Sequence, residues 1–314
     1  MKKSGCLLNA TLSFAALACL TAIVCVQNAA AQATPVHVLV SAEARHGSTV
    51  PEITKSDVFV YEGHDRDQVT DWVPAQGDHA GLELFILLDD GSSSSLGNQL
   101  EDLRKFITAQ PASTKIGLAY MQNGSGKVEQ SPTADHAAVA KALRLPLGIG
   151  GINASPYISL SDLIKRWPES SDRREVLMVT DGVDPYYGSG DLNNPYLEAA
   201  IDDAVRAGII VFAIYSPGAG HFGHSYWQNH WGQMYLSQVT DETGGEGYYL
   251  GFTGTPVAFQ PYLEDMGRHL DHQYWLTFNA KARKKDGWQR IKVTTEVSNA
   301  DLVAPHQAYV PAAP

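Results

Sequence analysis

The sequence predicts an α/β fold: a doubly wound, mostly parallel sheet with flanking N- and C-terminal β segments that form a small β-sandwich. Apolar runs at 84–88, 175–180 and 209–215 have the continuous hydrophobicity of strands buried on both faces. Segments with helical spacing separate these runs, as in a parallel sheet covered by helices on both sides. The two ends of the chain carry short β-branched and aromatic runs broken by turn residues, which is typical of antiparallel strands.

The first 33 residues have the pattern of a secretory signal peptide. Lys2 and Lys3 precede an apolar stretch from about Cys6 to Val26, and the small residues that follow predict cleavage after Ala31 or Ala33. An uncleaved anchor is the alternative, because the stretch approaches the ~20 residues that span a bilayer. All three cysteines lie in this segment, so the cleaved chain has no disulfide, reactive thiolate or cysteine zinc site. A secreted or periplasmic protein is expected.

The charge of the chain limits its partners. Its formal net charge is −11, and loss of Lys2 and Lys3 with the signal peptide makes it −13. An acidic surface disfavours nucleic acids and anionic lipids. We therefore expect a protein partner, no nucleic acid, and no membrane span in the mature chain.

The mature chain is longer than one average domain and divides by its pattern of elements. After the signal peptide (1–33), an N-terminal β module covers 34–78, an α/β domain 79–270 and a C-terminal β segment 271–314. The N-terminal module has predicted strands at 36–41, 56–63 and 69–73, and a Pro- and Gly-containing linker at 74–80 follows.

Strands and helices alternate in the central region. Strands are predicted at 84–88, 115–121, 175–180, 209–215 and 247–251, and helices near 100–107 and at 134–145, 158–167, 195–207, 234–243 and 257–270. Gly208 is expected to end its helix in the left-handed conformation. In the tail, Asp286-Gly287 predicts a hairpin between strands at 274–278 and 288–297, and 302–310 can add another strand. The tail strands and the N-terminal module are expected to share one sandwich, with the α/β domain inserted between them.

Two of the apolar strands end in acidic turns, which gives a candidate metal site. Asp90, Ser92 and Ser94 follow the strand at 84–88 with the spacing Asp-x-Ser-x-Ser, and Asp181 follows the strand at 175–180. The carboxyl ends of parallel strands lie on one edge of a sheet. Two carboxylates without a basic neighbour in either loop favour a cation between them, and oxygen ligands suit Mg²⁺. The alternative is that these residues only cap the helices that follow.

These two turns resemble the motifs of the von Willebrand factor type A (VWFA) family. The matching residues are Asp90-Gly-Ser92-Ser-Ser94 and Thr180-Asp181-Gly182, in the family's order, and the resemblance extends from about residue 82 to 270. It implies a metal-ion-dependent adhesion site (MIDAS) that holds Mg²⁺, or Mn²⁺ or Ca²⁺. The serines would bind the metal directly, the aspartates directly or through water, and an acidic side chain of a partner protein would complete the shell.

The sequence departs from the family at one ligand. The family has a threonine in a Gly-rich loop between the two aspartates, whereas this loop contains Gly150 to Ser155 and no threonine. Asn153 or Ser155 can supply the missing oxygen. Because the threonine ligand is missing, we expect the metal site to be weak or vestigial.

An aromatic segment at 221–231 is a second candidate binding element. Tyr226, Trp227 and Trp231 are of the type enriched at interface centres, and their loop is predicted to lie over the same sheet edge. The alternative is that these rings pack on the domain's own helices. His221, His224 and His230 also allow a zinc site, but no helix or carboxylate fixes them, and a surface loop is favoured.

Two functional hypotheses follow from the sequence. The first is a secreted, non-enzymatic, adhesion-type protein that engages an acidic group of its partner through Mg²⁺. The second is an assembly module with a metal-free site, which binds through its aromatic loop. A metal-dependent hydrolase is a third, weaker alternative, because adjacent Asp89 and Asp90 point in opposite directions and no nucleophile elbow is present.

Overall fold

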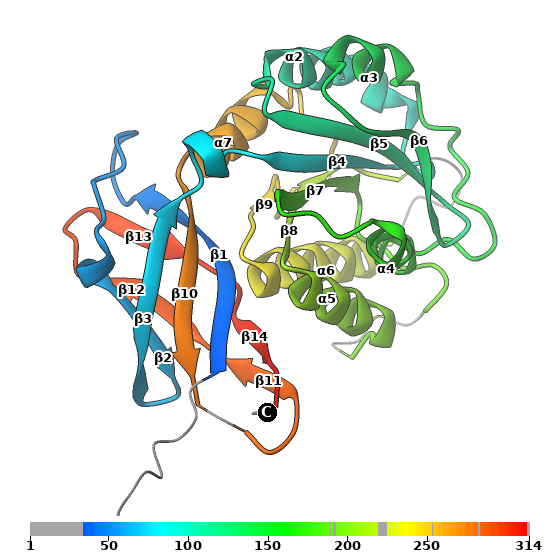
Figure 1. Cartoon of the computed structure of the whole chain (residues 1–314). Helices are drawn as coiled ribbons and strands as arrows, with labels where there is room; N and C mark the ends of the chain where they lie inside the picture. Colours follow the sequence, from blue (N-terminus) through cyan, green and yellow to red (C-terminus); the bar gives the residue numbers. More distant parts are fainter. Residues whose placement is uncertain are drawn as a thin grey trace, which may run out of the picture.

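A computed structural model describes residues 34–188, 190, 193–218, 225–252, 254–281 and 283–312. The predicted signal peptide lies outside these residues, as do His221 and His224. Figure 1 shows two bodies, an antiparallel β body and a larger α/β body. Among the described residues, no helix is both long and apolar enough to cross a bilayer.

The antiparallel body joins the two ends of the chain. Its six-stranded sheet has the order β12-β2-β3-β10-β1-β13. The strands are β1 (Thr34–Ala44), β2 (Val58–Glu62), β3 (Asp65–Pro74), β10 (Gln273–Ala280), β12 (Lys292–Thr295) and β13 (Ala300–Val303). β10, drawn in orange, lies between β1 and β3 and pairs with both (Figure 1). Because β10 comes from the tail, this sheet needs both ends of the chain.

A separate two-stranded sheet pairs β11 (Gly287–Arg290) with β14 (Gln307–Val310). Buried side chains of both sheets form one apolar core, which includes Val38 and Val40 of β1, Phe278 of β10 and Val310 of β14. Alternating apolar residues therefore form a core between the N-terminal and C-terminal segments.

The α/β body contains a second six-stranded sheet, with the order β6-β5-β4-β7-β8-β9. The strands are β4 (Leu82–Asp89), β5 (Thr114–Gln122), β6 (Ser125–Thr133), β7 (Arg173–Thr180), β8 (Ile209–Tyr215) and β9 (Gly247–Tyr248). All neighbours pair in parallel except β5 and β6, which are antiparallel. The central strands β4 and β7 therefore end side by side at one edge.

Helices cover both faces of this sheet. One apolar cluster includes side chains of α2 (Leu100–Ala109), α3 (His136–Ala142) and α7 (Gln260–Asp271), and the opposite cluster includes side chains of α4 (Pro156–Arg166), α5 (Pro195–Ala207) and α6 (Tyr226–Thr243). Local signals fix the helix ends: Ser155 and Asn194 cap α4 and α5 with their side chains, and Gly208 and Gly244 end α5 and α6 in the left-handed conformation.

The predicted fold class is wrong for the molecule as a whole. The antiparallel sheet has as many strands as the parallel-rich sheet, and a further two-stranded sheet is also antiparallel. The chain is therefore a mixed protein of an α/β body and a large antiparallel body, and not one doubly wound parallel sheet with a small attachment. The reason is that strands from the two ends of the chain pair with one another. They form one antiparallel sheet although the α/β region separates them in the sequence.

Three local predictions also fail. Asp286-Gly287 does not join a hairpin, because β11 pairs with β14 and β10 pairs with β1 and β3. The predicted strand at 288–297 is split at Ile291 into β11 and β12, which belong to different sheets. β6 was not predicted, because its sequence, SGKVEQSPT, has valine as its only large apolar residue and so lacks an apolar pattern.

Candidate binding site at the strand ends

Two adjacent aspartates at the end of β4 point in opposite directions. Asp89 is the last residue of β4 and faces Thr180 at the end of β7: Asp89 Oδ2 accepts a hydrogen bond of 2.7 Å from Thr180 Oγ1. Asp90 is fully buried and faces the loop after α3. Side chains alternate along an extended chain, so the two carboxylates serve different places.

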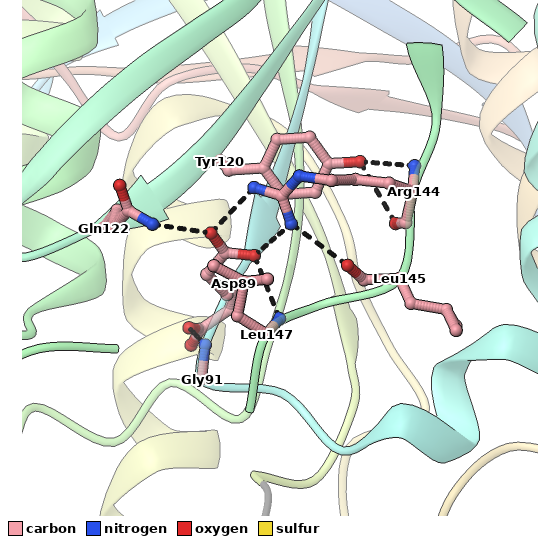
Figure 2. A network of polar contacts seen from close by, with 8 residues as sticks. Asp89, Gly91, Tyr120, Gln122, Arg144, Leu145 and Leu147 are labelled. Carbon is pink, nitrogen blue, oxygen red and sulfur yellow. Dashed lines mark hydrogen bonds and ion pairs between the residues drawn. The ribbon is translucent and has the colours of Figure 1, made fainter. Parts of the chain in front are cut away.

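Asp90 is held by Arg144 in a two-pronged ion pair. Figure 2 labels Arg144, Gln122 and Leu147, which all donate to this carboxylate. Arg144 Nη1 and Nη2 donate to Asp90 Oδ1 and Oδ2 over 2.6 and 2.8 Å, in the bidentate arrangement that is strongest for arginine and carboxylate. Gln122 Nε2 and the Leu147 backbone N–H donate to the same carboxylate over 3.1 and 3.3 Å. The hydrogen bond with Asp90 raises the pKa of Arg144. Both oxygens of Asp90 are therefore used within the protein.

The same arginine fixes the Gly-rich loop. Its guanidinium carbon lies 3.7 Å from the centre of the Tyr120 ring, a cation–π contact. Tyr120 Oη accepts from the Arg144 backbone N–H and donates to the Arg144 carbonyl (Figure 2). Ile149 N–H donates to the Asp90 carbonyl, and the Gly150 carbonyl accepts from Asn123 N–H. The loop is thus anchored at the ends of β4 and β5.

Asp89 and Asp181 face each other across this edge. Asp89 Oδ1 accepts from Gly91 N–H over 2.7 Å, and Asp181 Oδ1 accepts from Val183 N–H over 2.8 Å. Burial and the charge of Asp181 raise the pKa of Asp89 to about 6, although the hydrogen bonds from Thr180 and Gly91 oppose the shift. The carboxylates that share this edge are Asp89 and Asp181, whereas Asp90, the predicted partner of Asp181, is paired with Arg144.

The other predicted ligands do not converge on this pair. Ser92 is buried, with an Oγ that has no hydrogen-bond partner among the described residues, and its backbone forms a bridge with Gly218. Ser94 is exposed at the start of the short helix η4 (Ser94–Asn98). Asn153 is exposed, whereas Ser155 is buried and its Oγ accepts from Ile158 N–H as the cap of α4.

A cavity of about 910 Å³, the edge pocket, opens beside the two carboxylates. Asp89, Asp181 and Ser155 line it, whereas Asp90, Ser92, Ser94 and Asn153 do not. Its walls are the Gly-rich loop, the start of α4, the turn after Asp181 and the start of α6. Among the described residues that line it, Asp89 and Asp181 are the only Asp, Glu, Lys or Arg.

Exposed apolar side chains surround this edge. Of the ten large apolar side chains that are exposed in the described part of the chain, nine lie on segments that follow α3, β7, β8 or β9, and one, Val128, lies on β6. We call the nine the apolar rim: Leu145, Leu147, Ile149, Ile152, Tyr186, Tyr226, Trp227, Phe252 and Val257. They include Ile152, which is 94% exposed, and Tyr226 and Trp227, which are 70% and 67% exposed.

The aromatic residues belong to a helix and not to a loop. Tyr226, Trp227 and Trp231 lie in the first turns of α6, which Ser225 caps through a capping box with Gln228. Tyr226 and Trp227 contact each other edge to face and are exposed, whereas Trp231 packs against the apolar cluster beside α6. Trp231 therefore packs on the domain itself, whereas Tyr226 and Trp227 are exposed, and their role in partner binding stays a prediction. His230 lies on α6, and no group of three His, Cys, Asp or Glu suited to a metal is found among the described residues.

The Mg²⁺ ligand set implied by the VWFA resemblance does not fit these residues. Arg144 holds Asp90, and neither Ser92 nor Ser94 lines the edge pocket. Only Asp181, Ser155 and the unpredicted Asp89 remain, and the oxygens of all three accept hydrogen bonds within the protein. The resemblance places the acidic edge correctly but not the ligands.

Sequence reasoning missed Arg144 and the rim. The Leu-Arg-Leu-Pro-Leu stretch at 143–147 was available as a signal, since one cation among apolar residues after a helix suggests a buried partner. No spacing rule links it to Asp90, which lies 54 positions earlier.

Comparison with known proteins gives structural matches only. No protein-family model matches the chain, and no curated protein matches it. Solved structures that align with it include an aerotolerance-related membrane protein from Bacteroides fragilis (TM-score 0.44, 13% identity, 61% of this chain and 99% of that chain). They also include the ArnB paralog VWA2 from Sulfolobus acidocaldarius (TM-score 0.36, 9% identity, 90% and 77%) and three N-terminal domains of the type V pili tip protein Mfa5 from Porphyromonas gingivalis (TM-score 0.42, 9% identity, 89% and 67%).

The structures that align with the chain thus include a VWA domain. At these identities and TM-scores no function is transferred from them. The α/β sheet itself has the strand order β6-β5-β4-β7-β8-β9.

Proposed function

We propose that this chain is an exported, non-enzymatic, adhesion-type module that binds a protein partner with the C-terminal edge of its α/β sheet. The observation that carries the proposal is the apolar rim. Nine of the ten exposed large apolar side chains of the described residues lie at this edge. Exposed apolar groups gathered in one region mark interaction sites, and tyrosine and tryptophan are enriched at the centres of interfaces.

The metal-independent form of this proposal is supported best. Asp90 already has a bound cation, the Arg144 guanidinium, and two arginine nitrogens with Gln122 and Leu147 satisfy its oxygens. A metal on Asp90 would have to displace the Arg144 guanidinium, which would then lose its carboxylate partner. The partner then contacts the rim directly, and chelators do not affect binding.

A second form of the proposal retains the metal. Asp89 and Asp181 line the same cavity, and Mg²⁺ can be held by two carboxylates and several waters. A divalent cation there (Mg²⁺, Mn²⁺ or Ca²⁺) would engage an acidic group of the partner. EDTA distinguishes the two forms.

Export is proposed from the pattern of the first 33 residues, with cleavage after Ala31 or Ala33. A secreted or periplasmic location suits an adhesion-type module, whose partners lie outside the cytoplasm. Mass spectrometry of the mature N-terminus tests this part of the proposal, since an N-terminus at Gln32 or Thr34 supports it and an intact Met1 contradicts it.

Capture from the native secretome tests the rim. The mature wild-type chain is compared with a Tyr226→Ser/Trp227→Ser variant and with Val128→Ser, a matched control because Val128 is the exposed apolar residue outside the rim. We expect the partner to be retained by wild type and Val128→Ser, and lost from the double variant. Equal retention by all three contradicts the proposal, and loss of the partner in EDTA from the wild type selects the metal form.

A further inference from the structure

A buried histidine lies where the two bodies meet. His269 is in the last turn of α7, and the chain passes from this helix directly into β10 of the antiparallel body (Figure 1). Its side chain is 6% exposed, and its ring lies 5.8 Å from the ring of Phe212 on β8. The Ala42 N–H of β1 donates to the His272 carbonyl over 2.9 Å. The imidazole is thus enclosed by elements of both bodies.

Both ring nitrogens of His269 face carboxylates. Nδ1 lies 3.8 Å from Glu43 Oε1 of β1, and Nε2 lies 3.5 Å from Asp265 Oδ2, one turn earlier in α7. An ionised carboxylate only accepts hydrogen bonds, whereas a neutral imidazole donates from one nitrogen and presents a lone pair at the other. Only the doubly protonated ring can therefore interact favourably with Glu43 and Asp265 together. In this form it connects β1 of one body to α7 of the other.

The surrounding charges favour the same protonation state. Burial opposes a charge on His269, but the interaction with Asp265 and the negative charges of Glu43 and Glu246 outweigh burial and raise its pKa. The fully buried Glu175 of β7 also attracts this charge. Among the described residues, no Lys or Arg forms an ion pair with Glu43, so the imidazolium is its cation. The charged and titratable groups around the site are Glu43 and Arg45 of β1, Asp265 and Arg268 of α7, Arg173 and Glu175 of β7, Glu246, Tyr248 of β9 and Asp301 of β13.

We infer that His269 is a pH-dependent ionic bridge between the two bodies: the protonated ring holds Glu43 of β1 and Asp265 of α7 together, and its deprotonation releases the end of α7 from β1. Because the folded state binds this proton more tightly than the unfolded state does, the stabilising contribution is present below pH 6.5, and it is lost as the pH rises through the folded pKa. The inference does not depend on the proposed function. The apolar rim belongs to the α/β body alone, so release changes how that body is held and leaves the rim intact.

An NMR titration of the His269 imidazole in the mature chain tests the bridge itself. We expect the wild-type ring to titrate above pH 6.5. Glu43→Gln and Asp265→Asn should each lower its midpoint by at least about half a pH unit, because each removes one facing charge. Glu129→Gln, at an exposed acid of β6, is the matched control and should leave the midpoint unchanged. A wild-type midpoint at or below 6.5, or one that neither Glu43→Gln nor Asp265→Asn moves, overturns the inference.

Amide hydrogen exchange tests the release. The Ala42 N–H, which donates to the His272 carbonyl, reports opening between β1 and α7, and the Ser159 N–H of α4 reports whether the α/β body stays folded. After correction for the intrinsic exchange rate, we expect the protection of Ala42 to fall at least about tenfold in the wild type between pH 5.5 and 8.5. His269→Gln should remove this dependence on pH. His37→Gln, the same change at an exposed position of β1, should preserve it.

Glu175 is the competing titratable group, because burial raises its pKa to about 7. Glu175→Gln separates the two residues. If the protection of Ala42 still depends on pH in His269→Gln but not in Glu175→Gln, the release belongs to Glu175 and the inference is overturned. Equal protection of Ala42 at both pH values in the wild type overturns it as well.

Discussion

At the scale of single residues, neighbouring Asp89 and Asp90 have separate tasks. Asp90, with Arg144, holds the Gly-rich loop against the ends of β4 and β5, and Asp89 presents its carboxylate to the edge pocket. The pair therefore divides into a carboxylate that holds the loop and one that lines the pocket. Each task leads to a different measurable effect.

Loss of the Arg144 side chain should destabilise the fold. Arg144→Ala leaves the buried Asp90 carboxylate without its ion pair, and we expect a loss of roughly 2–4 kcal/mol in unfolding free energy, because Arg144 is partly exposed and solvent weakens the pair. Urea unfolding measures this loss in unfolding free energy. The Arg144→Met/Asp90→Leu variant removes both charges and should regain part of the loss. A loss below about 0.5 kcal/mol for Arg144→Ala would show that the ion pair is not structural.

Asp89 should make stability depend on pH. Its folded pKa of about 6 exceeds the usual value of 3.8, so the folded state holds this proton more tightly than the unfolded state does. The stabilising contribution is present below pH 4 and is lost as the pH rises through 6. The unfolding free energy of Asp89→Asn should equal that of wild type near pH 4 and exceed it by up to about 3 kcal/mol at pH 8. Denaturant unfolding at pH 4 and pH 8 checks this prediction. An equal difference in unfolding free energy between the variant and wild type at both pH values contradicts it.

At the scale of elements, one close contact positions α6 and hence its exposed aromatic residues. Gly182, with φ of +71°, follows Asp181, and Gly232 of α6 packs against this turn. A Cβ on Gly232 would lie 2.4 Å from the Asp181 carbonyl oxygen and 2.8 Å from Val183 N. The helix can lie this close only because both residues are glycine.

A pair of glycine variants tests this contact. Gly232→Ala forces α6 away from the turn and should lower the unfolding free energy by about 1–3 kcal/mol. Gly267→Ala, in α7, adds a Cβ that meets nothing within 4 Å and should raise it by about 0.5–1 kcal/mol. Thermal unfolding of both variants gives the comparison. If Gly232→Ala is as stable as Gly267→Ala, the turn does not fix α6.

The sequence predicts elements well where the pattern is local. The buried strands β4, β7 and β8 and the capped helix α5 are near their expected positions, because apolar runs and capping residues act over short ranges. β6 was missed because pairing with β5, and not its own composition, makes it a strand. The tail hairpin was wrong because β10 finds partners more than 190 positions earlier in the chain.

The site was predictable only in part for a similar reason. The acidic edge follows from strands that end side by side, and Asp181 comes directly after one of them, β7. The choice between Asp89 and Asp90 depends on where β4 ends, and a shift of one residue reverses the direction of a side chain. The ion pair with Arg144 directs Asp90 away from the pocket. This is a tertiary contact, between residues 54 positions apart in the sequence.

At the scale of the whole molecule, the two bodies are joined by buried polar contacts as well as by the chain. Arg173, at the start of β7, donates to Gln273 Oε1 of β10 over 2.5 Å and to the Leu270 carbonyl over 2.8 Å. Gln273 Nε2 donates to Ser41 Oγ of β1. This junction lies at the start of β7, whereas the apolar rim lies beyond the strand ends. The rim is thus at the opposite end of the α/β sheet from the antiparallel body.

The response of thermal stability to Mg²⁺ tests most directly whether this edge works without a metal. The mature wild-type chain and Asp181→Asn are melted in increasing MgCl₂, with NaCl at matched ionic strength as the reference. The account predicts that Mg²⁺ shifts neither melting temperature beyond the NaCl reference. A saturable rise of several degrees in the wild type that Asp181→Asn abolishes would contradict it.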